Sequence, residues 1–224
     1  MTLKTRSLLR RPSALWRAWP WLGVLLLAAC SALPERPVRA VQYDFGPGPV
    51  QSAAQPAHDR PVLALSDLES GGVLEGSNAV LYRLGYADSQ ELRPYAQARW
   101  SLPPAQLVRQ RLRDRLGRQR TVLSAADSVA LVRSMDRPLP VLRVELEEFS
   151  QLFDSPGQSL GLVRLRATLV NTTPAGDVLL GQTVLIARSP APTPDASGGV
   201  QALTQATDQL AGELDAWLDQ TLHP

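Results

Sequence analysis

The residue whose position says most about its chemistry is Cys30, the only cysteine in the chain. It directly follows an apolar segment, Trp19 to Ala29, and the residues before that segment include five basic ones and no acidic one. A basic start, a short apolar core and small residues at its end are typical of a secretory signal peptide. The segment is too short for a transmembrane helix, which needs about 20 residues. The sequence therefore predicts an exported chain that is cleaved beside Cys30.

Residues 27–30, Leu-Ala-Ala-Cys, resemble the bacterial lipobox. The resemblance implies that the cysteine sulfur receives a diacylglycerol, that the chain is cut just before it, and that the new amino terminus is acylated. Stable anchoring takes at least two acyl chains, because one chain binds a membrane only marginally. Ser31 follows the cysteine, and since an aspartate there retains enterobacterial lipoproteins on the inner membrane, the serine favours the outer membrane. A lone cysteine is otherwise a buried small hydrophobe, a reading that this position argues against.

Other residues that could do chemistry form no convincing catalytic group. Four carboxylates are candidate acids or bases: Asp44, Glu145, Glu147 and Glu148. Glu145 and Glu147 are expected on the outer face of a strand, and no serine has a histidine placed to activate it. The two histidines, His58 and His223, are far apart and offer almost no metal ligands. The sequence predicts no catalytic residue, no cofactor and no metal, with a paired-carboxylate glycosidase as the enzymatic alternative.

The charge balance argues against a nucleic-acid-binding protein, and the cysteine content argues against a disulfide-stabilised fold. The chain has 23 basic and 21 acidic residues, but five of the basic ones precede Cys30. The remainder has 18 basic and 21 acidic residues, a net charge of −3, so the basic character belongs to the leading segment. A nucleic-acid partner is not expected. With one cysteine, the chain also forms no intramolecular disulfide.

Composition divides the chain into three parts. Residues 1–29 are the predicted signal peptide, residues 30–40 a lipidated tether with two prolines and no periodicity, and residues 41–222 a folded domain. Alternating apolar and polar residues predict strands; these lie at 41–45, 61–68, 79–84, 92–100, 120–123, 142–147, 163–169 and 177–188. Pro94 favours an edge position for its strand. The glycine-rich residues 70–78 lack the Gly-Lys-Ser/Thr of a phosphate loop and are expected to be a surface loop.

The clearest strand pair combines opposite charges. Glu145 and Glu147 on one strand would face Arg164 and Arg166 on an antiparallel neighbour. Helical spacing predicts two main helices, at about 103–117 and 200–222, the first opened by prolines and ended by Gly117. The apolar stripe of the second helix is expected to face the core. The fold class is therefore α/β, a single domain with a mixed, largely antiparallel sheet and both helices packed against it.

The first helix and its exit are rich in arginine, which has two readings. Arginines could contact lipid head groups or an acidic partner, or they could simply form the solvated face of an amphipathic helix. A second polar face is expected on the strand at 92–100, opposite its apolar residues. The candidate partner surface consists of Arg93, Tyr95, Arg99, Arg109 and Arg113.

Several short segments in a fixed order support a family resemblance. They are Tyr43-x-Phe45, Leu81-Tyr82-Arg83-Leu84, Tyr95 to Trp100 with Pro103-Pro104 after it, Leu142 to Leu146 leading to Phe149 and Phe153, and the closing helix with Trp217. Together with Cys30, they resemble the ABC-type transport auxiliary lipoprotein family, which includes the paraquat-inducible lipoprotein component. The resemblance spans nearly all of the chain after the predicted cleavage site.

The resemblance implies both a fold and a function. The fold is an α/β domain whose mixed sheet carries packed helices. The function is that of an outer-membrane-anchored, periplasmic accessory to an ABC transporter that carries a lipid-binding MCE subunit and moves phospholipid between the membranes. The ATPase, permease and MCE subunits would be separate chains. Another envelope assembly lipoprotein, serving lipopolysaccharide transport or outer-membrane-protein insertion, is the alternative, and a homo-oligomer is left open.

Overall fold

Three long antiparallel strands form the centre of the fold. They are β7 (Leu139–Ser155), β8 (Gln158–Thr173) and β9 (Gly176–Pro190). The computed structural model describes residues 39–48, 60–124, 126–127, 138–173 and 176–222. All three strands were predicted but are longer than expected, because β7 and β8 continue to a two-residue turn at Pro156 and Gly157.

The predicted charge pairing between β7 and β8 is confirmed. Glu145 lies directly opposite Arg166 in the register. Glu147 lies 2.7 Å from Nε of Arg164 and 2.6 Å from Nη2 of Arg166. These pairs occupy the face of the sheet opposite the core, so each contributes only modestly to stability, but together they fix which residues of the two strands oppose each other.

Shorter strands complete a mixed sheet along the other edge of β7. Strands β2 (Leu63–Leu65), β3 (Glu69–Ser70) and β4 (Ala79–Leu84) each pair with β7 in parallel. Strand β5 (Asp88–Trp100) forms a hairpin with β4, while β1 (Val41–Tyr43) pairs with β5 and β6 (Val122–Ser124) pairs with β2, both in parallel. The glycine-rich segment therefore includes β3 and a 3-10 turn, η3 (Gly72–Leu74), that ends on the buried Leu74.

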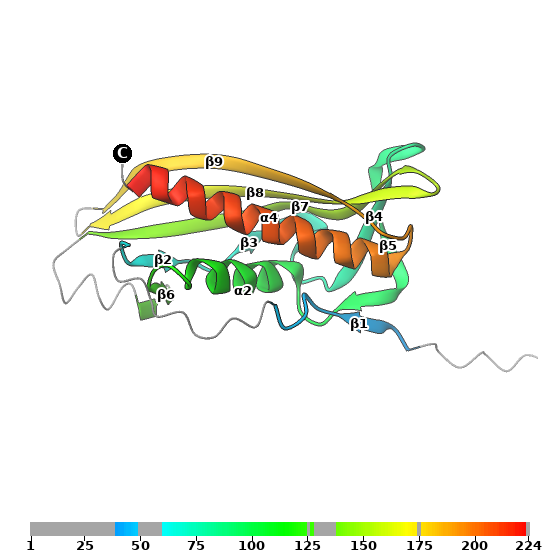
Figure 1. The fold of residues 1–224 in the computed structure, drawn as a ribbon, viewed down its shortest axis with the longest axis horizontal. Coiled ribbons are helices and arrows are strands. Elements are labelled where there is room, and N and C mark those ends of the chain that lie inside the picture. Colours follow the sequence, from blue (N-terminus) through cyan, green and yellow to red (C-terminus); the bar gives the residue numbers. More distant parts are fainter. Residues whose placement is uncertain (1–38, 49–59, 125, 128–137, 174–175, 223–224) are drawn as a thin grey trace, which may run out of the picture. The chain divides into compact units, whose positions relative to one another are not determined.

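Both predicted main helices are present, α2 (Pro104–Leu116) and α4 (Ala196–Leu222), and Figure 1 shows both on one side of β7, β8 and β9. The expected core-facing stripe of α4 is confirmed, since the apolar side chains along it are buried, among them Leu203, Leu210, Leu214 and Leu218. The helix begins four residues earlier than predicted, where Asp195 accepts the backbone N–H of Gly198 at 2.8 Å.

Aromatic side chains close the core beneath α2. Trp100 is fully buried, with its ring centroid 5.6 Å from that of Phe45 and 5.5 Å from that of Phe149. These rings come from β5, β7 and the segment after β1. The cluster therefore joins parts of the sheet that are far apart in sequence, and its edge-to-face and tilted rings add packing energy beyond area burial.

Helix α4 approaches β8 more closely than side chains normally permit, and Gly161 is the reason. A Cβ at this position would lie 2.5 Å from the backbone carbon of Ala202 and 2.5 Å from the backbone nitrogen of Leu203. Both neighbours are backbone atoms of a long buried helix, so they cannot move aside independently. The sequence position needs glycine because of space, not because of an unusual φ angle.

We therefore expect Gly161→Ala to lower the free energy of unfolding by about 1–3 kcal/mol, because the added methyl must displace α4 from the sheet. Urea denaturation followed by circular dichroism measures this change. Gly157→Ala in the turn is the matched control, since a Cβ there meets no atom within 4 Å. Equal stability of the two variants would show that the close approach carries no cost.

Candidate functional site

The residues predicted to do chemistry are distributed as follows. Cys30, the predicted lipidation site, lies outside the described residues. Asp44 accepts the backbone N–H of Gly46 at 2.7 Å, and Glu145 and Glu147 face arginines on β8. No three His, Cys, Asp or Glu side chains gather to hold a metal ion in the part of the chain that the structure describes. None of the described helices is both long and apolar enough to cross a membrane.

Tyr95 does not lie on the exposed face that the sequence predicts. It is partly buried, its hydroxyl donates to Oε1 of Gln151 at 2.9 Å, and its ring centroid lies 4.6 Å from that of Tyr82. Gln151 is fully buried and donates in turn to Oγ of Ser159 at 2.7 Å. Burial is the main cause that raises the pKa of Tyr95 above its usual value. Tyr95 is thus part of a polar network inside the fold.

The expected alternation along β5 holds for the buried Ala98 and Trp100 but is wrong at Tyr95, because the strand is irregular. Ala79 of β4 pairs with Arg99, whereas Leu81 pairs with Pro94, so one intervening residue on β4 faces four on β5. The extra residues reverse which side of the sheet each side chain points to. Leu92 and Tyr95 therefore both pack against the core, although strict alternation would place their side chains on opposite faces of the sheet.

The two predicted arginines of β5 have different surroundings. Arg99 uses Nη1 to donate to the backbone oxygens of Tyr95, at 2.6 Å, and Ala98, at 2.7 Å. It therefore braces the irregular part of its own strand. Arg93 pairs with Glu91 two residues earlier and remains at the surface. Pro94 sits where β5 has β4 as its only partner among the described strands, which is consistent with the predicted edge position.

As a group, the arginines of α2 form neither a free surface for lipid head groups or an acidic partner nor a simple solvated helix face. Arg109 pairs with Asp67, and the buried Arg111 lies 3.3 Å from Asp208 of α4. Nε of Arg115 lies 3.8 Å from Asp215, which is also on α4. Arg113 is exposed and makes no close ion pair with any described residue, although its charge helps to lower the pKa of Asp127. Most of this positive charge therefore serves to attach α2 to its own neighbours.

A buried ion cluster at the end of α2 was missed by the sequence reasoning. Arg120 is 1% exposed, and its Nη2 lies 3.3 Å from Asp215 and 2.6 Å from Asp219. Arg60 contacts the same two carboxylates at 3.4 and 2.8 Å. Asp215 itself is buried, although acidic side chains of an amphipathic helix are expected on its solvent-facing side. The available signal was that Asp215 follows Leu214 and precedes Leu218, at the border of the apolar stripe.

Arg120→Ala should destabilise the domain by about 3 kcal/mol or more, because it removes the most buried cation facing Asp215 and leaves that carboxylate with partly exposed partners. Thermal and urea unfolding would measure the loss. Arg113→Ala on the exposed face of α2 is the matched control and should change stability by at most about 0.5 kcal/mol. A loss for Arg120→Ala no larger than for the control would rule out a stabilising role for the cluster.

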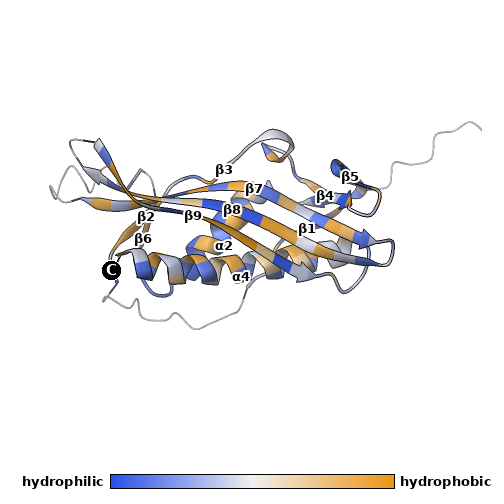
Figure 2. Cartoon of the chain, turned by 90° about the horizontal axis from the view of Figure 1, so that it is seen from above, coloured by the Kyte–Doolittle hydropathy of each residue, from blue (hydrophilic) through white to orange (hydrophobic). Residues whose placement is uncertain are grey.

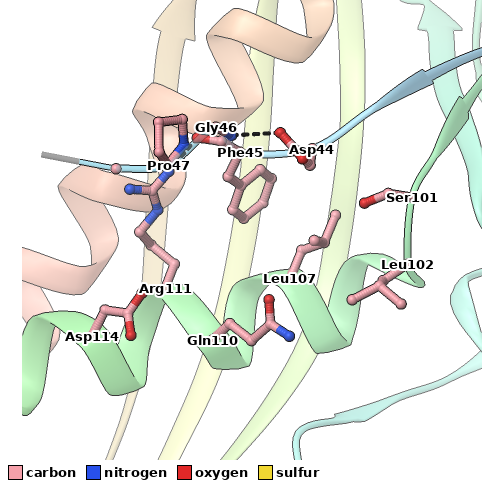
Figure 3. A pocket seen from close by; sticks show the side chains of 11 residues that line it. Asp44, Phe45, Gly46, Pro47, Ser101, Leu102, Leu107, Gln110, Arg111 and Asp114 are labelled. Atoms are coloured by element: carbon pink, nitrogen blue, oxygen red, sulfur yellow. Dashed lines mark hydrogen bonds between the residues drawn. The ribbon is translucent and has the colours of Figure 1, made fainter. Parts of the chain in front are cut away.

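A pocket of about 240 Å³ lies between the segment after β1 and helix α2 (Figure 3). Arg111 stands at its wall, donating from Nη2 to the backbone oxygen of Phe45 at 2.5 Å, with its guanidinium 5.6 Å from the centre of that ring. Because Asp208 already faces this guanidinium, little of its charge is available to an anionic ligand. Asp44, Gln110 and Asp114 supply further polar groups to the lining. The arrangement mainly attaches the segment after β1 to α2.

In the part of the chain that the structure describes, these features define the class as a single α/β domain in which an open, mixed nine-stranded sheet packs against the two main helices. The chain belongs to the family of ABC-type transport auxiliary lipoprotein components, which it matches over residues 43–214. The resemblance stated from the sequence is therefore confirmed. No curated protein matches the chain.

Solved structures share this fold at low sequence identity. Protein XCC0632 from Xanthomonas campestris is 16% identical with a TM-score of 0.58, and the match covers 82% of this chain and 94% of that one. A crystal structure titled only as an uncharacterized protein is 13% identical with a TM-score of 0.55, over 81% and 99% of the two chains. At such identities the likeness shows the fold alone.

Proposed function

We propose that this protein is a lipoprotein of the bacterial outer membrane that faces the periplasm and serves as a non-catalytic component of an ABC transport system. In this proposal the system carries an MCE-type subunit and moves lipid, in particular phospholipid, between the two membranes. Membership of the transport auxiliary lipoprotein family over residues 43–214 is the observation that carries the proposal. In this proposal the ATPase, permease and MCE subunits are separate chains, and the lack of a Gly-Lys-Ser/Thr phosphate loop in this sequence is consistent with an ATPase supplied by another chain.

The order of segments supports an anchored role. Residues 1–29 are a signal peptide, the lipidated tether spans residues 30–40, and the domain occupies residues 41–222. A fully extended tether of this length reaches at most about 40 Å, at 3.3–3.6 Å per residue. The domain is therefore held within reach of the membrane surface. The diacylglycerol on the sulfur of Cys30 and the acyl chain on its amino group together supply the several acyl chains that stable anchoring needs.

The proposed partner surface is narrower than the five residues taken from the sequence. Tyr95 and Arg99 make contacts within the domain that a partner would have to break. Arg93 and Arg109 each pair with a nearby carboxylate at the surface. Arg113 is exposed on α2 and has no ion pair among the described residues, so it is the residue of this set best able to meet an acidic group on a partner.

The anchor is tested by mass spectrometry of the full chain purified from the membranes of its native host. We expect the mature chain to begin at Cys30, with a mass increased by a diacylglycerol and an amide-linked acyl chain. Cys30→Ser should leave the leader uncleaved by the lipoprotein pathway and remove the chain from the outer-membrane fraction of a density gradient. Ser31→Ala is the matched control and should keep both properties. An unmodified thiol on an intact leader would contradict the proposal.

The partner is tested by affinity purification of the native lipoprotein with mild detergent. We expect an MCE-type subunit to copurify, and Arg113→Glu to reduce its yield several-fold because the reversal repels an acidic partner surface. Arg113→Lys keeps the positive charge and should retain the partner. Absence of any MCE subunit from repeated purifications would count against the transport assignment. Equal yields from Arg113→Glu and the wild type would instead reject this residue while leaving the partner in place.

A further inference from the structure

Strand β9 has one edge without a partner among the described strands. It pairs with β8 along its whole length, from Gly176 to Pro190, and with no other strand that the structure describes. β9 is 15 residues long. A strand edge of this length presents a row of N–H and C=O groups to which another strand can bind.

The edge also lacks the charges that usually protect such strands. Between Asp177 and Arg188 the sequence is Val-Leu-Leu-Gly-Gln-Thr-Val-Leu-Ile-Ala, without one ionisable group. Val178 is 56% exposed, Leu179 64% and Ile186 44%. Figure 2 shows the hydropathy along β9 and its place at the border of the sheet. Proteins normally guard an exposed edge with lysines, prolines or a covering segment; β9 has a single register shift, where Leu180 is skipped in pairing with β8.

The two charges that flank this apolar stretch lie on one face of the sheet. Asp177 stands opposite Thr172 of β8, and Arg188 stands opposite Leu162. Thr172 and Leu162 are an even number of residues apart on a regular strand, so their partners point the same way. Each strand therefore has an acid at its beginning and a base at its end, both outside the helix-covered face.

This arrangement is self-complementary. A two-fold axis perpendicular to the sheet would place the β9 strands of two copies antiparallel, with the beginning of one strand beside the end of the other. Asp177 of each copy, which also pairs with Arg143 of its own β7, would then lie at the end that carries Arg188 of the other, and Ile186 of each copy would lie opposite Leu179 of the other. A parallel pairing would bring like charges together.

We propose that the protein forms a homodimer in which two β9 strands pair antiparallel and the two sheets become one. The pairing satisfies backbone groups at the edge, removes exposed aliphatic side chains from water, and leaves α2 and α4 of both copies on the same side of the joined sheet. The partner is a second copy of this chain. The proposal does not depend on the lipid anchor or on the transport assignment.

The test uses the full chain purified in detergent, with its mass measured by light scattering that separates protein from detergent, over a range of concentrations. The wild type should be a dimer. Val184→Lys places two like charges on either side of the axis, and Ile186→Lys places a charge beside the exposed Leu179 of the other copy, so each should weaken the dimer by about tenfold. Val62→Lys is the matched control, because Val62 is an exposed aliphatic residue beside a different strand. Circular dichroism confirms that every variant folds.

A charge exchange tests the orientation. Arg188→Asp alone should weaken the dimer, whereas Arg188→Asp combined with Asp177→Arg and Arg143→Asp, which keeps an opposite-charge pair between residues 143 and 177, should restore it to within a few-fold, as only the antiparallel arrangement predicts. A monomeric wild type, a dimer unaffected by either lysine, or a larger ring would overturn the proposal. A monomer whose edge is instead protected by a copurifying protein would overturn it as well, since the occupant would then be a different chain.

Discussion

The structure depends on the close contact between helix α4 and the β7–β8 hairpin. Two glycines make this contact, because a Cβ at Gly161 would strike the backbone of α4 and one at Gly199 would lie 2.1 Å from Oε1 of the buried Gln151. With the helix at this distance, its leucine stripe covers β8 and β9, and α2 can pack beside it. Gln151 in turn accepts a hydrogen bond from the hydroxyl of Tyr95, so the same contact also fixes the position of the irregular strand β5.

Charge in this domain is used mainly between its own elements. The arginines on and after α2 meet the acidic residues of α4, and the acidic row of β7 meets the basic row of β8. Buried pairs cost desolvation and are weak sources of net stability, but an unpaired member would be far more costly. They therefore specify how α2 sits on α4. The same pairing explains why a high arginine content does not make α2 a general anion-binding surface.

The sequence predicted what depends on local pattern and missed what depends on long-range register. The Glu145 and Arg166 pair was predictable because alternation of charge on two adjacent strands fixes both face and register. The orientation of Tyr95 was not, because the extra residues in β5 relative to β4 break the alternation only after pairing. Asp215 looked like a surface acid because the cations that neutralise it, Arg60 and Arg120, lie 155 and 95 residues away.

The contacts of the domain also limit where a partner can bind. One face of the long strands is filled by α2 and α4 (Figure 1), and the charged rows on the other face are already paired with each other. Two parts of the described surface that remain open are the exposed side of α2 around Arg113 and the edge of β9. The first presents a cation and the second a strand edge whose central residues, 178–187, are uncharged, so they suit different binding chemistries, an acidic group and a backbone edge. A subunit of a larger assembly can therefore use both at once, since neither region has to give up a contact that the fold needs.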